Sequence, residues 1–397
     1  MRIAYIAPYQ GPGLIERRPV VRNLSLAGNV KIELVSELLH RGGHDVEVLS
    51  QGEVDDRRFR LYPGFYEPKQ FHSEIPVFYA SMLPIRFVTG IWSSWRIRRL
   101  FRGRHAVRPF DVVIIYNFKQ PQVFIASHAM THLGLPVVVE YEDDVFVDIG
   151  GKAELGFRSK LYLKFTRDVL KGAAGGLGAS PHLLSRMPPG IPRMLLRGVV
   201  DEDILKASER PLAARKNWVV YSGTHTRSKG LEPLITAWKT LNLQGWELHI
   251  AGHGELTSVL EQMAENHKSI VFHGLLNRRE NAQLLGEAKI GINPHDVSQT
   301  PGNVFAFKII EYIAAGAHCI TTPMGELEPE IEGGVTYMPD NLPATIGTVL
   351  QQVIEENGYE RVAAQAAQDA YGPDAVAKSL DRLLRQVMAA KPGEVSS

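Results

Sequence analysis

The sequence predicts an α/β protein made of two domains, each built around a parallel, doubly wound sheet. The 397 residues exceed what one hydrophobic core usually serves. Strand-like and helix-like segments alternate from the first residue, and the alternation starts again after Val200. Hydrophobic residues make up 44% of the chain and charged residues 22%, which is typical of a globular protein. Two such halves in tandem predict a ligand-binding cleft between them.

The first half contains two strand–helix–strand units. The predicted elements are strand Arg2–Ala7, helix Val30–His40 and strand Val46–Leu49, then strand Val112–Tyr116, a second helical stretch and strand Val137–Glu140. A helix between two short apolar strands favours parallel pairing of those strands.

The second half repeats this alternation more regularly. The predicted elements are strand Trp218–Ser222, helix Leu231–Leu241, strand Glu247–Ala251, helix Leu256–Glu265, strand Ile270–His273, helix Arg279–Ala288, strand Ile290–Asn293, a helix beginning near Val304 and strand His318–Thr321. We expect domains at residues 1–200 and 201–372, with the charged segment Asp201–Lys216 as a hinge. Residues 373–397 predict an amphipathic helix that packs on the first domain, followed by a polar tail.

Composition excludes several classes of protein. The single cysteine, Cys319, excludes an internal disulfide framework and fits a reducing compartment, so the cytoplasm is the expected location. The apolar runs have strand length and are too short to span a membrane. No metal-binding motif is evident, and no nucleic-acid recognition motif accompanies the basic residues.

The first half of the chain is the basic half. Residues 1–205 carry 27 Lys and Arg against 21 Asp and Glu, whereas the remainder carries 17 against 22. The segment Gln10–Ala27 is longer than most loops. Its residues Arg17, Arg18 and Arg22 either meet an anionic acceptor or are solvated, and the sequence does not separate these two interpretations.

The stretch TPGNVFAFKIIEYIAAGAHCITT, Thr300–Thr322, places two charged residues in an otherwise apolar helix. Asn303 is a suitable N-cap for a helix starting near Val304, and a helix N-terminus attracts phosphate. Glu311 follows about two turns later, a spacing that suits phosphates at the helix start and ribose hydroxyls on the carboxylate. The alternative is that Lys308 and Glu311 form a surface ion pair worth about 0.3 kcal/mol.

Several segments together resemble glycosyltransferase family 4. The segments, in the family's order, are Gly28–Ser50, Tyr221–Trp238, Leu248–Glu255, Ile270–Leu276 and Phe307–Thr322. The resemblance covers nearly the whole chain. It implies the GT-B fold, with two Rossmann-like domains facing a central cleft. It also implies a retaining, metal-independent transferase that moves a sugar from a nucleotide-diphosphate donor.

The resemblance assigns donor-binding roles to the stretch around Asn303. Glu311 matches the second glutamate of the family's Glu-x7-Glu motif, which holds the donor ribose. Asn303 stands where the family has the first glutamate, which reads the sugar hydroxyls, and an amide there carries no charge. Val304 and Phe305 would offer backbone N–H groups to the distal phosphate, and Lys308 is included in the donor site.

A second group of donor-binding residues follows from the same resemblance. Lys229 matches the lysine of the basic pair that neutralises the departing diphosphate. Thr224 replaces the usual arginine of that pair, and Arg227 in the same loop is the candidate to compensate. Gly28 and Asn29 fit the small residues at the start of the first crossover helix, where the chain approaches the phosphates. Without the resemblance, a loop lysine is usually just solvated.

The strand that ends in PVVVEYEDDVF carries a carboxylate cluster. Asp143 fits the family's aspartate, and Glu142 takes the place of the family's histidine. We predict that these carboxylates orient the acceptor hydroxyl or take its proton, with Lys229 as the third catalytic residue. Two alternatives remain open: a magnesium or manganese site that also uses Asp144, and a structural role in capping the next helix.

Residues Trp92–Arg108 read WSSWRIRRLFRGRHAVR, with six arginines and no acidic residue. Aromatic residues interleave with the arginines, which suits a helix lying on an anionic bilayer. The alternative is a helix that covers the sheet with its tryptophans packed inward and its arginines in solvent.

The sequence therefore predicts a retaining glycosyltransferase, cytoplasmic or peripheral on the inner face of a membrane. The expected partners are a nucleotide-sugar donor and a saccharide or lipid-linked acceptor, such as a polysaccharide precursor. No cofactor beyond the donor is expected. Two alternatives are a non-catalytic relative that keeps the fold, supported by the departures at Thr224, Glu142 and Asn303, and a sugar-nucleotide epimerase.

Overall fold

The structure is a computed structural model that describes residues 1–18, 26–54, 60–70, 75–85, 89–143, 157–241, 243–299, 305–356 and 361–390. Contacts divide the chain into two units. Unit 1 comprises Met1–Arg197 with Ala377–Ser397, and unit 2 comprises Gly198–Val376.

Unit 1 is built on an eight-stranded sheet with the order β3-β4-β2-β1-β5-β6-β7-β8. All neighbouring strands are parallel except the edge pair β3 and β4. The strands are β1 (Arg2–Ile6), β2 (Asp45–Ser50), β3 (Phe65–Gln70), β4 (Ile75–Tyr79), β5 (Val112–Tyr116), β6 (Val137–Tyr141), β7 (Gly175–Gly178) and β8 (Arg193–Leu195).

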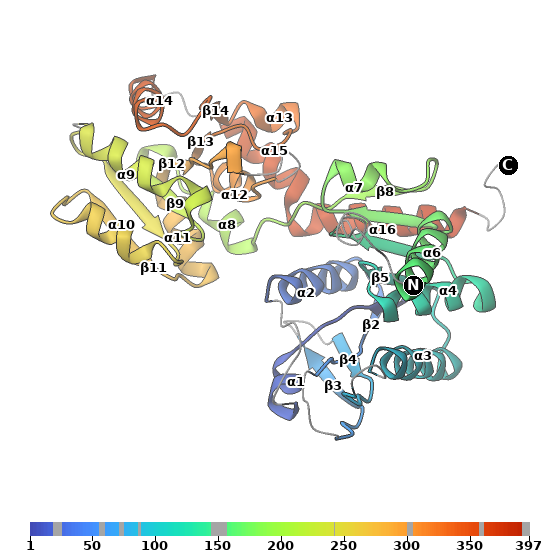
Figure 1. The fold of residues 1–397 in the computed structure, drawn as a ribbon. Coiled ribbons are helices and arrows are strands. Elements are labelled where there is room, and N and C mark those ends of the chain that lie inside the picture. The colour runs from blue at the N-terminus through green and yellow to red at the C-terminus, as the bar shows by residue number, and fades with distance from the viewer. Residues whose placement is uncertain are drawn as a thin grey trace. The chain divides into compact units, whose positions relative to one another are not determined.

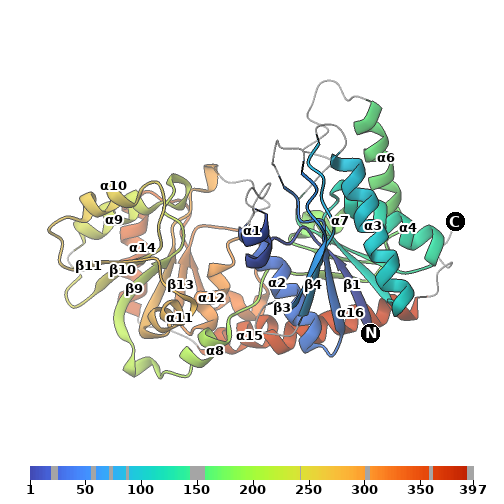
Figure 2. The ribbon, with the colours of Figure 1, turned by 90° about the horizontal axis from the view of Figure 1, so that it is seen from below.

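Helices cover both faces of this sheet. Figure 2 shows α3, α4 and α6 on one face and α2 and α16 on the other. The helices are α1 (Pro12–Arg17), α2 (Leu26–Arg41), α3 (Thr89–Val107), α4 (Gln120–Leu133), α6 (Phe157–Lys171), α7 (Pro181–Ser185) and α16 (Pro373–Ala389). Fully buried apolar residues of β1, β5 and β6 pack with residues of α3, α4 and α6 in one core cluster.

Unit 2 is built on a six-stranded, entirely parallel sheet with the order β11-β10-β9-β12-β13-β14 (Figure 1). The strands are β9 (Lys216–Ser222), β10 (Glu247–Ala251), β11 (Ile270–Gly274), β12 (Ala288–Asn293), β13 (His318–Thr321) and β14 (Val335–Tyr337). The helices are α8 (Glu202–Ala207), η1 (Leu212–Ala214), η2 (Arg227–Lys229), α9 (Leu231–Thr240), α10 (Thr257–Ala264), α11 (Arg278–Glu287), η3 (Val297–Gln299), α12 (Lys308–Ala314), α13 (Pro329–Glu332), α14 (Pro343–Glu356) and α15 (Arg361–Tyr371).

Two core clusters lie on opposite faces of the unit 2 sheet. One contains residues of α8, α11, α12 and α15, and the other contains residues of α9, α10 and α14. Strands covered on both faces read as continuous apolar runs rather than as alternating patterns. This explains why the unit 2 strands are recognisable in the sequence.

The prediction of two parallel α/β sheets is confirmed. The sequence missed the hairpin β3–β4, the strands β7, β8 and β14, and helix α1, which lies inside the segment read as a loop. The expected hinge contains α8, whose N-cap Asp201 accepts a hydrogen bond from the Asp203 backbone at 2.8 Å. No helix among the described residues is long and apolar enough to cross a membrane.

The start of helix α12 was predicted wrongly. The helix begins at Lys308 rather than near Val304, so Glu311 lies in its first turn and not two turns along. The Phe307 ring lies edge-on to Tyr371 and against Gly198, and this packing holds the residue at the N-cap position. Asn303 and Val304 lie outside the described residues.

Candidate functional site

In unit 2, the loop after β9 brings Lys229 to the carboxyl end of the sheet. Gly230 ends η2 with a φ of 68° and begins α9 directly. A Cβ atom at Gly230 would lie 1.8 Å from the Pro294 carbonyl oxygen, so only glycine permits this approach of the loop after β12. The close contact places Lys229 beside His295, and burial lowers the pKa of Lys229.

Lys308 reaches the same place from the first turn of α12. Its Nζ is buried, lies 4.1 Å from the centre of the Tyr221 ring, and has no hydrogen-bond partner in the described part of the chain. A Cβ atom at Gly223 would lie 2.4 Å from this Nζ, so the glycine leaves the space that the ammonium occupies. Burial, together with the charge of Lys229, lowers the pKa of Lys308 to about 7.

Glu311 lies three residues after Lys308, in the same first turn of α12. Burial raises the pKa of its carboxyl group, and the nearby Lys308 opposes that shift. None of the described residues makes a hydrogen bond to this carboxylate. The site therefore presents an ammonium and a carboxylate, both largely removed from water and neither hydrogen-bonded by a described residue.

The pKa values of two nearby histidines, His295 and His225, are lowered in part by the positive charge of Lys308. Burial, Lys229 and Lys308 together lower the pKa of His295 to about 4, so its imidazole is neutral at physiological pH. Burial also lowers the pKa of His225, whose Nδ1 lies 2.9 Å from Thr257 Oγ1. Neither lysine is hydrogen-bonded to an acidic group among the described residues, so the site has a positive potential that favours anions.

The structure brings together three of the predicted donor residues: Lys229, Lys308 and Glu311. Arg227 is exposed on η2, and the exposed Thr224 accepts a hydrogen bond from the Tyr221 hydroxyl through its backbone carbonyl. Phe305 lies three residues before α12, so it does not belong to the helix N-terminus as expected. Asn303 and Val304 cannot be placed because they fall outside the described residues.

In unit 1, Gly28 and Asn29 lie in the first turn of α2. The Asn29 side chain donates to the Gln10 carbonyl at 2.8 Å and accepts from the Gln10 backbone N–H at 3.1 Å. This pair of hydrogen bonds fixes the loop after β1 to the start of α2. The two residues therefore lie near the start of the first crossover helix, which begins at Leu26 rather than at Val30, and their contact with phosphates stays a prediction.

Asn117 organises the carboxylates that follow β6. With a φ of 54°, it directs its side chain to the neighbouring strand end. Its Oδ1 accepts from the backbone N–H groups of Glu142 at 2.9 Å and Asp143 at 3.1 Å, and its Nδ2 donates to Asp143 Oδ2 at 2.9 Å. Asp143 is exposed and Glu142 is half-buried.

Glu142 belongs to a cluster of titratable groups that the sequence did not reveal. Glu140, two residues earlier on β6, is fully buried, accepts a hydrogen bond from the Tyr5 hydroxyl and interacts electrostatically with the Glu142 carboxyl group. Lys31 Nζ lies 3.3 Å from Glu142 Oε1 and donates to the Leu196 carbonyl at 2.9 Å. Burial and the charge of Glu142 raise the pKa of Glu140 to about 8, and burial raises the pKa of Glu142.

The clearest indication of this cluster in the sequence is Glu140, a glutamate inside an otherwise apolar strand. A glutamate inside an apolar strand must be paired or neutral, because an isolated buried charge costs several kcal/mol. Nothing local shows that Tyr5 and Lys31 would be its neighbours, since they lie on β1 and α2. No group of three potential metal ligands gathers among the described residues, and Asp144, which the metal alternative also uses, lies outside them.

Neither interpretation of Arg18 was correct. The residue is 1% exposed, and its guanidinium donates to the backbone carbonyls of Gln51, Gly52, Pro63 and Ala80. Burial lowers the pKa of Arg18 to about 10. It is a structural residue that ties α1 to the β3–β4 edge, while Arg17 lies 4.5 Å over the Phe65 ring. Arg22 lies outside the described residues.

Helix α3 partly matches both interpretations of the arginine-rich segment. Ile97 and Phe101 are buried against the sheet, so the helix does cover it. Ile91 and Trp95 are 62% and 46% exposed, so the tryptophans are not simply packed inward. Trp92 is half-buried and lies 5.5 Å from Trp95.

Two family models match the chain. Residues 28–188 match the glycosyl transferase 4-like domain, and residues 216–356 match the glycosyl transferases group 1 domain. Together they cover about three quarters of the sequence. The chain belongs to the group 1 glycosyltransferases. No curated protein matches it.

Solved structures share the arrangement of this glycosyltransferase at low sequence identity. Sucrose-phosphate synthase from Thermosynechococcus elongatus is 17% identical with a TM-score of 0.63, covering 98% of this chain and 100% of that one. HepE from Anabaena in complex with UDP is 13% identical with a TM-score of 0.63, covering 97% and 100%. A Listeria monocytogenes protein assigned as a UDP-N-acetylglucosamine 2-epimerase is 10% identical with a TM-score of 0.55, covering 98% and 97%. The fold is therefore GT-B, as predicted.

Proposed function

We propose that this glycosyltransferase takes its sugar from a nucleoside-diphosphate donor bound in unit 2. One observation carries the proposal: Lys308 and Glu311 lie on the first turn of α12, and no described residue hydrogen-bonds either charged group. A diphosphate would satisfy the ammonium groups of Lys308 and Lys229, and ribose hydroxyls would satisfy the carboxylate. The UDP bound to HepE supports this class of ligand.

The lysines also favour transfer without a metal ion. Negative charge builds on the departing diphosphate in the transition state, and fixed positive groups there stabilise it. Lys229 and Lys308 supply two such groups from different elements. We propose that the sugar keeps its anomeric configuration, with the acceptor attacking from the leaving-group face, as the family resemblance implies.

The acceptor hydroxyl is assigned to the carboxylates of unit 1. Asp143 is exposed and held by Asn117, so it can orient a hydroxyl. Glu142 has a raised pKa, which brings its proton affinity closer to neutral pH, where a general base works best. The proposed acceptor is a saccharide or a lipid-linked saccharide, such as a precursor of a surface polysaccharide.

We propose a membrane location on the basis of α3. The exposed Ile91 and Trp95 precede the arginines of this helix, and a surface that is both basic and apolar suits anionic lipid headgroups. We propose peripheral attachment to the cytoplasmic face, a location consistent with the free, buried Cys319.

A thermal-shift screen with UDP, GDP, ADP and TDP tests the donor site. A ligand that binds only the folded state raises its stability, by about 2.7 kcal/mol at a hundred times Kd. We expect one of the four to raise the melting temperature and the others to have little effect.

Lys229→Ala and Glu311→Ala should each lower transfer by about tenfold or more. Near-normal activity in both variants would refute the assignment.

An epimerase is the second candidate, because the Listeria protein shares the fold. The two activities differ in their products. A transferase consumes the donor in proportion to acceptor, releases the nucleoside diphosphate and is idle without acceptor apart from slow hydrolysis. An epimerase changes the sugar of the donor with no acceptor present. Incubation with a panel of nucleotide sugars separates these two activities from each other, and also from a non-catalytic relative, which would turn over none of them.

A further inference from the structure

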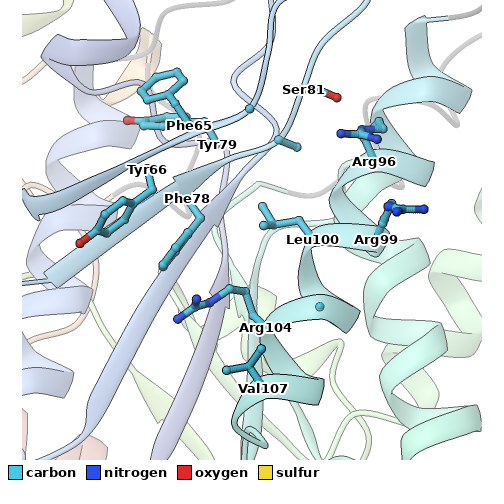
Figure 3. A pocket seen from close by; sticks show the side chains of 13 residues that line it. Phe65, Tyr66, Phe78, Tyr79, Ser81, Arg96, Arg99, Leu100, Arg104 and Val107 are labelled. Carbon is cyan, nitrogen blue, oxygen red and sulfur yellow. The ribbon is translucent and has the colours of Figure 1, made fainter.

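Unit 1 contains a groove between the β3–β4 edge and α3 (Figure 3). Its volume is about 530 Å³. Tyr66 and Phe78 line it from the strands, and Leu100 and Arg104 extend toward them from α3. No acidic residue is among the described residues that line it. The groove is distinct from the Glu140–Glu142 cluster, with which it shares no residue.

The strands give the groove an aromatic wall. Tyr66 and Phe78 are partners in the antiparallel pair, and their rings stack with centroids 5.0 Å apart. Tyr66 is 50% exposed. Phe65 and Tyr79 stack with each other as the adjacent cross-strand pair, and residues adjacent on a strand point to opposite faces. The Tyr66–Phe78 pair therefore presents a flat surface that an apolar group or a sugar ring can cover.

Arg104 belongs to the floor of the groove rather than to its ligand-binding groups. Its Nε and Nη2 donate to the two oxygens of Glu47 at 2.9 and 2.7 Å, and its guanidinium lies 4.2 Å over the Phe78 ring. A bidentate pair with a buried carboxylate uses the positive charge of this arginine inside the protein.

Arg96 and Arg99 are different, because no carboxylate among the described residues pairs with either. Arg96 Nε is buried without a hydrogen-bond partner in the described part of the chain, and its guanidinium lies 5.4 Å over the Trp95 ring. A buried donor without an acceptor is energetically unfavourable, and an incoming acceptor removes this cost. Arg99 is exposed at the groove, one turn further along the helix.

We propose that this groove binds a phosphate ester, with Arg96 and Arg99 on the phosphate and the Tyr66–Phe78 wall against the rest of the molecule. Guanidinium groups bind phosphate with directed, paired hydrogen bonds. The inference extends the membrane contact proposed above, because the ester is supplied either by a membrane phospholipid or by a water-soluble sugar or glycerol phosphate. Ile91 and Val107, 62% and 79% exposed on the same helix, place apolar side chains near both of its ends.

Two double variants with equal charge loss test the proposal. Arg96→Gln/Arg99→Gln removes the groove arginines. Arg98→Gln/Arg102→Gln removes two exposed arginines of the same helix that do not line the groove. These two arginines lie near His128 of α4 and help to lower its pKa. Diffuse attraction to an anionic surface depends on net charge and falls about equally in both variants.

Binding is measured with two probes: vesicles of phosphatidylglycerol and phosphatidylcholine, and glycerol 3-phosphate. If the source is lipid, the groove variant binds the vesicles at least about tenfold more weakly than the matched variant. If the source is soluble, wild type and the matched variant bind glycerol 3-phosphate and the groove variant does not. Equal loss of vesicle binding in the two variants, with no binding of glycerol 3-phosphate, overturns the proposal, as does a wild type that binds neither probe.

Nucleotide binding by the same samples distinguishes a failure of this inference from a failure of the donor-site proposal. Both double variants should show the wild-type thermal shift with the nucleoside diphosphate, because the groove and the donor site lie in different units. A normal nucleotide shift with no phosphate-ester binding rejects only the groove. Phosphate-ester binding without any nucleotide shift rejects only the donor site. Equal melting temperatures of the two variants without ligand confirm that both fold.

Discussion

The two units place charged side chains at the same kind of location, beyond the carboxyl ends of parallel strands, but they balance these charges differently. In unit 1 the Glu142 carboxylate faces Lys31, Asp143 accepts from Asn117, and Glu140 accepts from Tyr5. In unit 2, Lys308 Nζ has no hydrogen-bond partner among the described residues. The charges of the unit 1 cluster are therefore largely matched inside unit 1, whereas those of the unit 2 cluster are not matched by the described residues, as our proposal of a bound diphosphate requires.

Burial has opposite effects on the two clusters, because one is acidic and the other basic. It raises the pKa of Glu140 to about 8 and lowers the pKa of Lys308 to about 7. In unit 1 the Oε1 atom of Glu140 is buried without a hydrogen-bond donor among the described residues, and a proton held between the Glu140 and Glu142 carboxyl groups would satisfy it. In unit 2 the proposed diphosphate would supply the anion that Lys308 lacks among the described residues. The difference suggests that unit 1 is built to handle a proton and unit 2 a phosphate group.

The largest effect is expected from Lys308→Met, which removes the positive charge while keeping the volume. We expect affinity for the nucleoside diphosphate to fall about a hundredfold, because a charged hydrogen bond contributes roughly 1.5–3 kcal/mol. The measurement is calorimetric titration with the ligand found in the screen. Lys239→Met, at an exposed lysine of α9, is the matched control and should bind normally. Unchanged affinity in Lys308→Met would show that the site does not bind phosphate.

The same variant should be more stable than wild type without ligand. The pKa of Lys308 is 10.5 in its ordinary state and about 7 in the fold, so between these values the unfolded chain holds a proton that the native state lacks. Wild-type stability therefore rises with pH across this range, and the cost of the buried charge is fully present below pH 7. The gain in melting temperature of Lys308→Met should be largest at pH 6 and shrink toward pH 10. A pH-independent difference contradicts the burial of this charge.

Glu311→Gln tests whether the Glu311 carboxylate contacts the ribose of the nucleoside diphosphate. We expect about tenfold weaker binding of the nucleoside diphosphate, because a neutral amide replaces a charged acceptor. The variant should also lose most of the preference of wild type for the ribonucleotide over its 2′-deoxy analogue. Paired titrations with both ligands measure this. If wild type and Glu311→Gln discriminate equally, the carboxylate does not contact the ribose hydroxyls.

The sequence predicted the unit 2 site better than the unit 1 site, and the reason is physical. Lys308 and Glu311 are three residues apart, so helix periodicity alone puts them side by side. Lys229 joins them because loops after neighbouring parallel strands meet at one edge of the sheet. The start of α12 was missed because it depends on Phe307 packing against Gly198 and Tyr371, residues that are distant in the sequence.

The Glu140 cluster could not be derived from local patterns. Tyr5 lies 135 residues from Glu140, and Lys31 lies on a helix between them in the sequence. The strand order brings Tyr5 and Glu140 together. Strands β1 and β6 both flank β5, so side chains of β1 and β6 can reach each other on one face of the sheet. The glutamate within VVVEY indicates an unusual buried site, but the residues that pair with it depend on the topology of the sheet.

Glu140→Gln tests the shared proton of unit 1. The Glu140 pKa is 4.5 in its ordinary state and about 8 in the fold, so the native state holds an extra proton between these values. Wild-type stability therefore falls as the pH rises from 4.5 to 8. The glutamine has no such proton to lose and can still donate to Glu142 through its amide. The variant should gain stability relative to wild type as the pH rises across this range.

Melting temperatures at several pH values from 5 to about 8 measure this relative gain. Glu37→Gln, on the half of α2 beyond Lys31, is a control for the loss of one carboxylate away from the cluster, and its curve should parallel that of wild type. If Glu140→Gln also parallels wild type, Glu140 is ionised throughout and the carboxyl groups do not share a proton.

The smallest effect is expected from Arg227→Gln, which tests whether this arginine replaces the one missing at Thr224. Arg227 is exposed on η2, whereas Lys229 is half-buried beside His295 in the same loop. An exposed charge acts through water and contributes about 0–1 kcal/mol, so we expect affinity for the donor diphosphate to fall less than about fivefold. Lys229→Gln, with the same change of charge two residues away, should cause a clearly larger loss. The Arg227→Gln loss should also vanish at high salt, because screening acts on exposed groups first. If the two variants lose affinity equally, Arg227 reaches the phosphates after all, and it then supplies the second cation of the pair from within the loop.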